Sequence, residues 1–197
     1  KNIALIGEDR ETTIIDGGGN GSVVSFNNGE NINTLIERFT IRNGYSEDGG
    51  GIYCYASSPT IRDIILTSNN SLDDGAGIWI GWESNPILDN LEIFNNTAAD
   101  HAGGIMLSNH SYPTIKASNI NSNHSFNEGG GIYIGNSQAI IDSLEIANNS
   151  SRVGAGIYIE SHEFPYYSVE ISNSSITNNI SEETGGAIQI NGGNLDL

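Results

Sequence analysis

A short glycine-rich block recurs six times along the 197-residue chain, and this repetition restricts the possible folds more than any other feature. In each copy, two small residues are followed directly by an isoleucine. These isoleucines are Ile52, Ile78, Ile105, Ile132, Ile157 and Ile188, so successive copies lie 26, 27, 27, 25 and 31 residues apart. Such a period is typical of solenoids, in which one repeat cannot bury its own apolar face and must stack on its neighbours.

Two further blocks recur between the glycine-rich copies. The first reads "SPTI" (58–61), "NPIL" (85–88), "YPTI" (112–115), "QAII" (138–141) and "SVEI" (168–171). The second reads "FTIRNG" (39–44), "ILTSNN" (65–70), "LEIFNN" (91–96), "SNINSN" (118–123), "LEIANN" (144–149) and "SSITNN" (174–179). All three blocks are short and alternate apolar with polar residues, which favours strands over helices. The sequence therefore predicts an all-β solenoid with three strands per rung and about 25–31 residues per rung.

Equivalent apolar residues of successive rungs are expected to stack as interior columns, about 4.8 Å apart. The glycine-rich block supplies the six isoleucines above and a second column of Cys54, Ile80, Leu107, Ile134, Ile159 and Ile190. The other two columns are Ile61, Leu88, Ile115, Ile141 and Ile171, and Ile41, Thr67, Ile93, Ile120, Ile146 and Ile176. An amide ladder is expected at Gly44, Asn70, Asn96, Asn123, Asn149 and Asn179. Cys54 is interpreted as a small core residue.

This combination of Gly-Gly-[Gly/Ala]-Ile, a proline-marked middle strand and a terminal [Leu/Ile]-x-Ile-x-x-Asn resembles the right-handed parallel β-helix repeats of the pectin-lyase-like superfamily. "GGAI" (185–188) and, in part, "FNN" (94–96) are also similar to repeats of bacterial polymorphic outer-membrane proteins. "LIGEDRETTIIDGGGNGSVVSF" (5–26) resembles the usual entry to such helices. The resemblance implies one right-handed parallel β-helix domain over residues 1–197. It says little about function, because this fold hosts lyases, hydrolases, epimerases and adhesins.

An outward-facing column of mostly aromatic residues is the main candidate binding site. It contains Tyr53, Trp79, Met106, Tyr133, Tyr158 and Gln189, with Tyr55 and Trp82 nearby. We expect these side chains to form an exposed stripe on which a sugar chain could stack, although the rings could equally stack on one another without a ligand. The longest rung adds the segment "ESHEFPYYS" (160–168), whose Phe164, Tyr166 and Tyr167 form a candidate binding loop.

Charged residues form two further outward columns. Arg62, Asp89, Lys116 and Asp142 alternate in sign and are expected to pair along the axis. Acidic residues gather at the turn before each glycine-rich block, and like charges one rung apart repel one another. A calcium ion bridging Asp48, Asp74 and Asp100 would remove that repulsion, because oxygen ligands suit hard cations. Calcium is thus a possible cofactor, and none is required.

The overall charge limits the partners and the location of the protein. Acidic residues outnumber basic ones by 24 to 7, for a formal net charge of −17, so neither nucleic acid nor an anionic membrane is expected as a partner. No apolar run approaches the roughly 18 residues that span a bilayer. The richness in Asn and Ser and the few lysines suit an extracellular or bacterial cell-surface protein, of which residues 1–197 are interpreted as a segment.

Three functions remain open at the level of the sequence. The favoured one is a non-catalytic adhesin, stalk or glycan-binding module that contacts a glycan or cell-surface partner. The alternative is a polysaccharide lyase or glycoside hydrolase with its site on residues 72–106, but Asp73-Asp74 lacks the companion motifs of the known enzymes. A third is a structural fibre segment that associates end to end.

Overall fold

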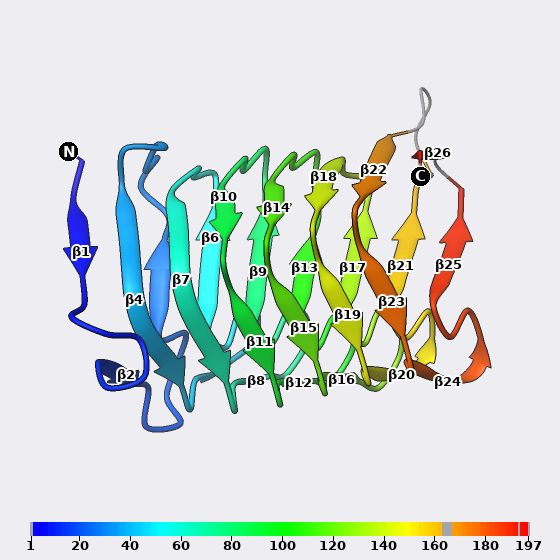
Figure 1. The fold of residues 1–197 in the computed structure, drawn as a ribbon, viewed down its shortest axis with the longest axis horizontal. Helices are drawn as coiled ribbons and strands as arrows, with labels where there is room; N and C mark the ends of the chain where they lie inside the picture. Colours follow the sequence, from blue (N-terminus) through cyan, green and yellow to red (C-terminus); the bar gives the residue numbers. More distant parts are fainter. Residues whose placement is uncertain (1, 163–166, 193, 197) are drawn as a thin grey trace.

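The chain winds as a β-solenoid of about seven turns in the computed structural model, which describes residues 2–162, 167–192 and 194–196 (Figure 1). The rungs stack along one axis from the N-terminal end to the C-terminal end, and equivalent strands of neighbouring rungs lie side by side (Figure 1). The described strands of neighbouring rungs pair in parallel, as in β7 with β10 and β9 with β13, and one isolated antiparallel bridge joins Gly21 to Tyr45. No membrane-spanning helix is found among the described residues.

The strands of the described residues form three sheets. The bent sheet holds β1 (Ala4–Ile6), β2 (Ile14–Asp16), β4 (Leu35–Arg42), β7 (Thr60–Thr67), β10 (Ile87–Asp89), β11 (Glu92–Phe94), β14 (Thr114–Lys116), β15 (Asn119–Asn121), β18 (Ala139–Asp142), β19 (Glu145–Ala147), β22 (Ser168–Ser172), β23 (Ser175–Thr177) and β26 (Asn194–Asp196). The narrow sheet holds β5 (Tyr45–Ser46), β8 (Asn70–Ser71), β12 (Thr97–Ala98), β16 (His124–Ser125), β20 (Ser150–Val153) and β24 (Ile180–Thr184). The glycine sheet holds β3 (Val24–Phe26), β6 (Ile52–Tyr55), β9 (Ile78–Gly81), β13 (Ile105–Leu107), β17 (Ile132–Gly135), β21 (Ile157–Glu160) and β25 (Ile188–Asn191).

Left-handed residues recur at several places in each rung, and two of these bends shape the bent sheet and its exit. One bend divides the bent sheet at Arg38, Asp63, Asn90, Ala117, Ser143 and Asn173. The other leads into the narrow sheet at Asn43, Ser68, Asn95, Ser122, Asn148 and Asn178, where φ lies between 54° and 57°. Asparagine tolerates this backbone better than most residues because its short polar side chain can bond to nearby backbone groups. The recurring Asn residues therefore fix where the chain turns.

The interior columns are confirmed, with two corrections. Three of the four predicted columns have the expected pairing, and their core members from Ile52 to Ile157 are buried. Ile190, on the last strand of the glycine sheet, is 41% exposed and is not an interior residue. In the fourth column, Leu66 and not Thr67 stacks between Ile41 and Ile93. The prediction was wrong because the block at 65–70 was aligned one residue too late. Cys54 is fully buried, and burial raises the pKa of its thiol to about 12, as suits a core residue.

The same one-residue shift affects the amide ladder. The ladder runs through Asn69, Asn96, Asn123, Asn149 and Asn179, so Asn69 takes the place expected for Asn70. Each Nδ2 donates to the Oδ1 of the next rung at 2.9–3.1 Å, and the first four amides are buried. Asn69 and Asn70 are adjacent, so either could occupy the ladder position in the sequence. The left-handed bend at Ser68 places Asn69, the next residue, in the ladder.

The small residues before each isoleucine allow neighbouring rungs to approach closely. A Cβ atom on Gly77 would lie 2.5 Å from the carbonyl oxygen of Gly104 on the next rung. No side chain fits there without moving backbone, which explains why the glycine-rich block recurs where the chain enters the glycine sheet.

Candidate functional site

The outward column of the glycine sheet is largely buried, so the expected fully exposed stripe is wrong. Trp79, Met106, Tyr133 and Tyr158 are each only 6–7% exposed and form a second apolar cluster with Ala102, outside the interior core. These four residues therefore offer little surface to a ligand.

Glycines next to the column explain this burial. The indole of Trp79 lies over Gly81, where a Cβ atom would come within 2.3 Å of the ring, and Tyr133 lies over Gly135 in the same way. On the other side, the turn at Gly75 packs against Met106 on the following rung. The rings thus lie flat on the sheet, with the preceding turns folded against them.

The buried tyrosines also have their hydroxyl groups engaged by the protein. The Tyr133 hydroxyl donates to Oε2 of Glu160 at 2.5 Å, and Nδ2 of Asn191 donates to the Tyr158 hydroxyl at 3.3 Å. Burial and the Glu160 carboxylate raise the pKa of Tyr133 above its ordinary value. The middle of the column therefore has a structural role.

One end of the column remains accessible. Tyr53 and Tyr55 are half-buried, and Trp82 is 54% exposed in the turn after β9. The Tyr53 ring stacks on Trp79 at 4.9 Å and on Tyr55 at 6.3 Å, and the Trp82 ring lies 5.7 Å from that of Tyr55. We call Tyr53, Tyr55 and Trp82 the aromatic platform. It contains the accessible aromatic rings of this column and its neighbours, while Gln189 at the other end is half-buried.

A cleft of about 280 Å³ adjoins the aromatic platform. It is lined by Ser22, Ser46, Glu47, Asp48 and Tyr53. Burial raises the pKa of Asp48 to about 6, and the neighbouring carboxylates of Asp74, Asp73 and Glu47 add to that shift, against the hydrogen bond from the Asp74 backbone N–H. Asp48 therefore changes its protonation state only slightly below neutral pH.

The acidic column at the turns contains a histidine at its centre. His101 follows Asp74 in the column, with Nδ1 2.9 Å from Oδ1 of Asp74 and Nε2 2.9 Å from Oε2 of Glu128. Burial opposes the charged imidazolium, but the hydrogen bond to Asp74 and the charges of Asp74, Asp100 and Glu128 outweigh it and raise the pKa of His101. Arg152 adds a second cation, 2.7 Å from Glu128. Protein cations thus offset much of the repulsion for which a calcium ion was invoked.

The three aspartates expected to share calcium fall into two overlapping groups. Asp48 lies with Asp73 and Asp74, whereas Asp100 lies with Asp74 and His101; within each group the ligand atoms are all within 4.8 Å of one another. Asp48 and Asp100 therefore do not belong to one compact set. The first group consists of oxygen ligands alone and is the better candidate for calcium.

Two other sequence predictions are modified. The column Arg62, Asp89, Lys116 and Asp142 is in register, and Lys116 pairs with Asp89 at 3.3 Å. Arg62, however, contacts Glu37 at 2.7 Å instead of Asp89. In the candidate loop, Phe164 and Tyr166 lie outside the described residues, and the Tyr167 hydroxyl bonds to Nδ1 of His110.

His101 is not among the site residues predicted from the sequence. The available signal was spacing, because Asp74, His101 and Glu128 lie 27 residues apart, which is one rung.

Comparison with known proteins addresses the fold alone. A family model described as a right-handed β-helix region matches residues 10–196. No curated protein and no solved structure matches the chain. The match spans nearly the whole chain, whereas ligand and activity have to be argued from the site itself.

Proposed function

The chain belongs to the right-handed β-helix family, and on this scaffold we propose that it is a non-catalytic module of a secreted or surface-attached bacterial protein that binds a glycan at the aromatic platform. The observation that carries the proposal is the group of three contacting rings, Tyr53, Tyr55 and Trp82, at the accessible end of an otherwise buried column. An adhesin or stalk would use such a site for attachment.

The form of the platform suits a sugar chain. Flat aromatic faces with a few polar groups beside them are the usual make-up of a small-ligand site, and the C–H faces of sugar rings pack against such rings. Ser22, Ser46 and the Asp48 carboxyl line the adjoining cleft and can bond to hydroxyl groups. The rigid rungs beneath hold these groups in place without any ordering on binding.

Affinity electrophoresis in gels containing neutral polysaccharides tests the proposal. The Trp82→Ala variant is expected to lose at least about tenfold in affinity, which corresponds to about 1.4 kcal/mol. Tyr112→Ala is the matched control, because Tyr112 is also exposed (42%) but lies outside the platform. Equal retardation of the wild type and Trp82→Ala, or none in any gel, would contradict the proposal.

A carbohydrate-active enzyme is the second candidate, and Asp48 is the observation that favours it. A carboxyl with a pKa of about 6 can hold a proton to donate near neutral pH, and the carboxylates of Asp73 and Asp74 lie within 4.8 Å of it. Release of reducing or unsaturated ends from polysaccharides, lost in Asp48→Asn, would replace the binding proposal with this one. Under the binding proposal, no such release occurs.

A further inference from the structure

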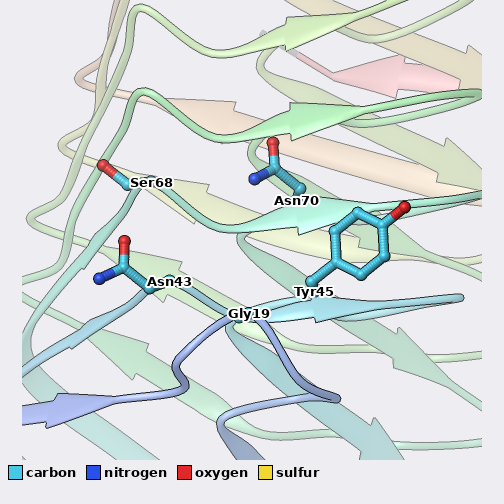
Figure 2. Close-up of a pocket in the computed structure, with 6 residues that line it drawn as sticks. Gly19, Asn43, Tyr45, Ser68 and Asn70 are labelled. Carbon is cyan, nitrogen blue, oxygen red and sulfur yellow. The ribbon is translucent and has the colours of Figure 1, made fainter.

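A second cleft, of about 400 Å³, lies where the bent sheet turns into the narrow sheet. It is lined by Gly19, Asn43, Gly44, Tyr45, Ser68 and Asn70 (Figure 2). None of these residues belongs to the aromatic platform or to the cleft beside Asp48. All six are uncharged, in a chain whose formal net charge is −17.

Two neighbouring rungs and one loop hold this cleft in shape. Asn43 and Ser68 are the left-handed bend residues of adjacent rungs, and Tyr45 pairs with Asn70 between β5 and β8. The glycine loop packs across them, since Gly19 N–H donates to the Asn43 carbonyl at 2.7 Å and Tyr45 N–H donates to the Gly21 carbonyl at 3.0 Å. The backbone of the cleft is therefore fixed before any ligand arrives.

The side chains present one flat ring and several neutral hydrogen-bonding groups. Tyr45 is 46% exposed, and Figure 2 shows its ring on one side of the cleft, Asn43 and Ser68 on the other, and Asn70 between them. The Asn43 amide is oriented by Asp16, because its Nδ2 donates to both carboxylate oxygens at 3.0 and 3.1 Å. This contact leaves the Asn43 carbonyl oxygen as the acceptor for a ligand, while Asn70 and Ser68 can both donate and accept.

This set of groups selects a particular chemistry. A cation would find no carboxylate among the lining residues, and an anion would find no basic group and would be repelled by the acidic protein. A neutral ligand with an apolar face and peripheral hydroxyl groups satisfies both the ring and the amides. We propose that the cleft at Tyr45 is a binding subsite for one neutral sugar unit, separate from the aromatic platform.

Titration of the ¹⁵N-labelled protein with neutral oligosaccharides tests this inference. The probes are the tetrasaccharides of β-1,4-linked glucose, mannose, xylose and N-acetylglucosamine, with tetragalacturonate as the anionic comparison. At least one neutral probe is expected to shift the backbone amide signals of Tyr45 and Asn70 in a saturable manner, and tetragalacturonate is not.

Variants then separate the subsite from the platform. Tyr45→Ala is expected to weaken the shifts at least about tenfold, Tyr45→Phe to retain them because the ring remains, and Trp82→Ala to leave them unchanged. The inference is overturned if no neutral probe shifts these signals, if Tyr45→Ala binds like the wild type, or if tetragalacturonate binds as well as the neutral probes. Failure of the platform proposal would show only in Trp82→Ala, so the two results are distinguishable.

Discussion

The Nδ1 atom of His101 lies 2.9 Å from Oδ1 of Asp74 on the preceding rung. The other ring nitrogen lies equally close to a carboxylate oxygen of Glu128 on the following rung. An imidazole that faces a carboxylate at each nitrogen is best satisfied when both nitrogens carry protons. We therefore expect the imidazolium form of His101 to be favoured within the acidic column and to stabilise the solenoid.

The first prediction concerns the pH dependence of stability. The pKa of His101 is raised in the folded state above the ordinary value of 6.5, so its stabilising contribution is complete below pH 6.5. That contribution is lost as the pH rises through the folded pKa. Thermal unfolding should show the wild type losing Tm above pH 6.5, and His101→Gln should be destabilised by about 2 kcal/mol at pH 6.

His162 provides the matched control for this experiment. Its side chain is 66% exposed, and its Nε2 lies 3.0 Å from a carboxylate oxygen of Glu160. His162→Gln should follow the wild-type profile of Tm against pH. If the Tm of His101→Gln falls above pH 6.5 as steeply as that of the wild type, the imidazolium does not stabilise the column.

The second prediction concerns Asp48, whose pKa is raised from 3.8 to about 6. A carboxyl with a raised folded pKa contributes stability that is present below pH 3.8 and lost as the pH rises through 6. Asp48→Asn should therefore be more stable than the wild type at pH 7, on the order of 1 kcal/mol after allowance for solvent screening. Chemical denaturation at pH 5 and pH 7 in the presence of a chelator measures this, with Glu182→Gln as control, because Glu182 is exposed and lies at the opposite end of the narrow sheet, on β24.

Calcium binding at Asp48 would make the wild type more stable than Asp48→Asn, the opposite of the result expected with a chelator. If the group of Asp48, Asp73 and Asp74 binds the ion, millimolar calcium should raise the Tm of the wild type and not that of Asp48→Asn. Asp100→Asn should keep the response, because Asp100 lies in the group that holds the His101 imidazolium. If calcium leaves the Tm of the wild type unchanged, the acidic column does not bind the ion.

The third prediction separates the two tryptophans that the sequence assigned to one stripe. Trp79 is 7% exposed and packed over Gly81, so Trp79→Ala should cost about 3–5 kcal/mol of unfolding free energy. Trp82 is exposed, and its φ of 59° is unfavourable for a residue with a Cβ atom. Trp82→Ala should stay within about 0.5 kcal/mol of the wild type, and Trp82→Gly should be stabilising. Equal losses in the two alanine variants would contradict this division.

The fold could be predicted from the sequence because stacking repeats one constraint many times. Each interior position is specified by five or six copies, so a single misread copy such as Thr67 does not change the architecture. Strand alternation predicts which side chains point outward, but it does not predict whether an outward side chain such as Trp79 is buried. Whether Trp79 stands out or lies flat depends on Gly81 two residues later and on the turn at Gly75, which belong to separate parts of the repeat.

The candidate site was harder to predict for the same physical reason. Contacts between turns join residues a full rung apart, as with Asp74 and His101, and a pairwise match at a spacing of 27 carries little weight in one sequence. The Tyr45 cleft depends on a glycine loop that precedes the regular repeats. Neither the contact between Asp74 and His101 nor the Tyr45 cleft belongs to the repeating pattern from which the fold is predicted.

The last prediction uses two adjacent asparagines that differ only in their place on the rung. Asn69 is fully buried: its Oδ1 accepts from the Gly44 N–H at 2.9 Å, and its Nδ2 donates to Oδ1 of Asn96 at 3.0 Å. Asn69→Ala leaves the buried Gly44 N–H without its acceptor and removes one of the two donors to Oδ1 of Asn96, so it should cost about 3 kcal/mol, whereas Asn70→Ala at the exposed neighbour should cost less than about 0.5 kcal/mol. Urea unfolding of the two variants measures the difference directly. Because the residue type and the sequence position are matched, similar losses would mean that the ladder adds nothing beyond ordinary turn formation.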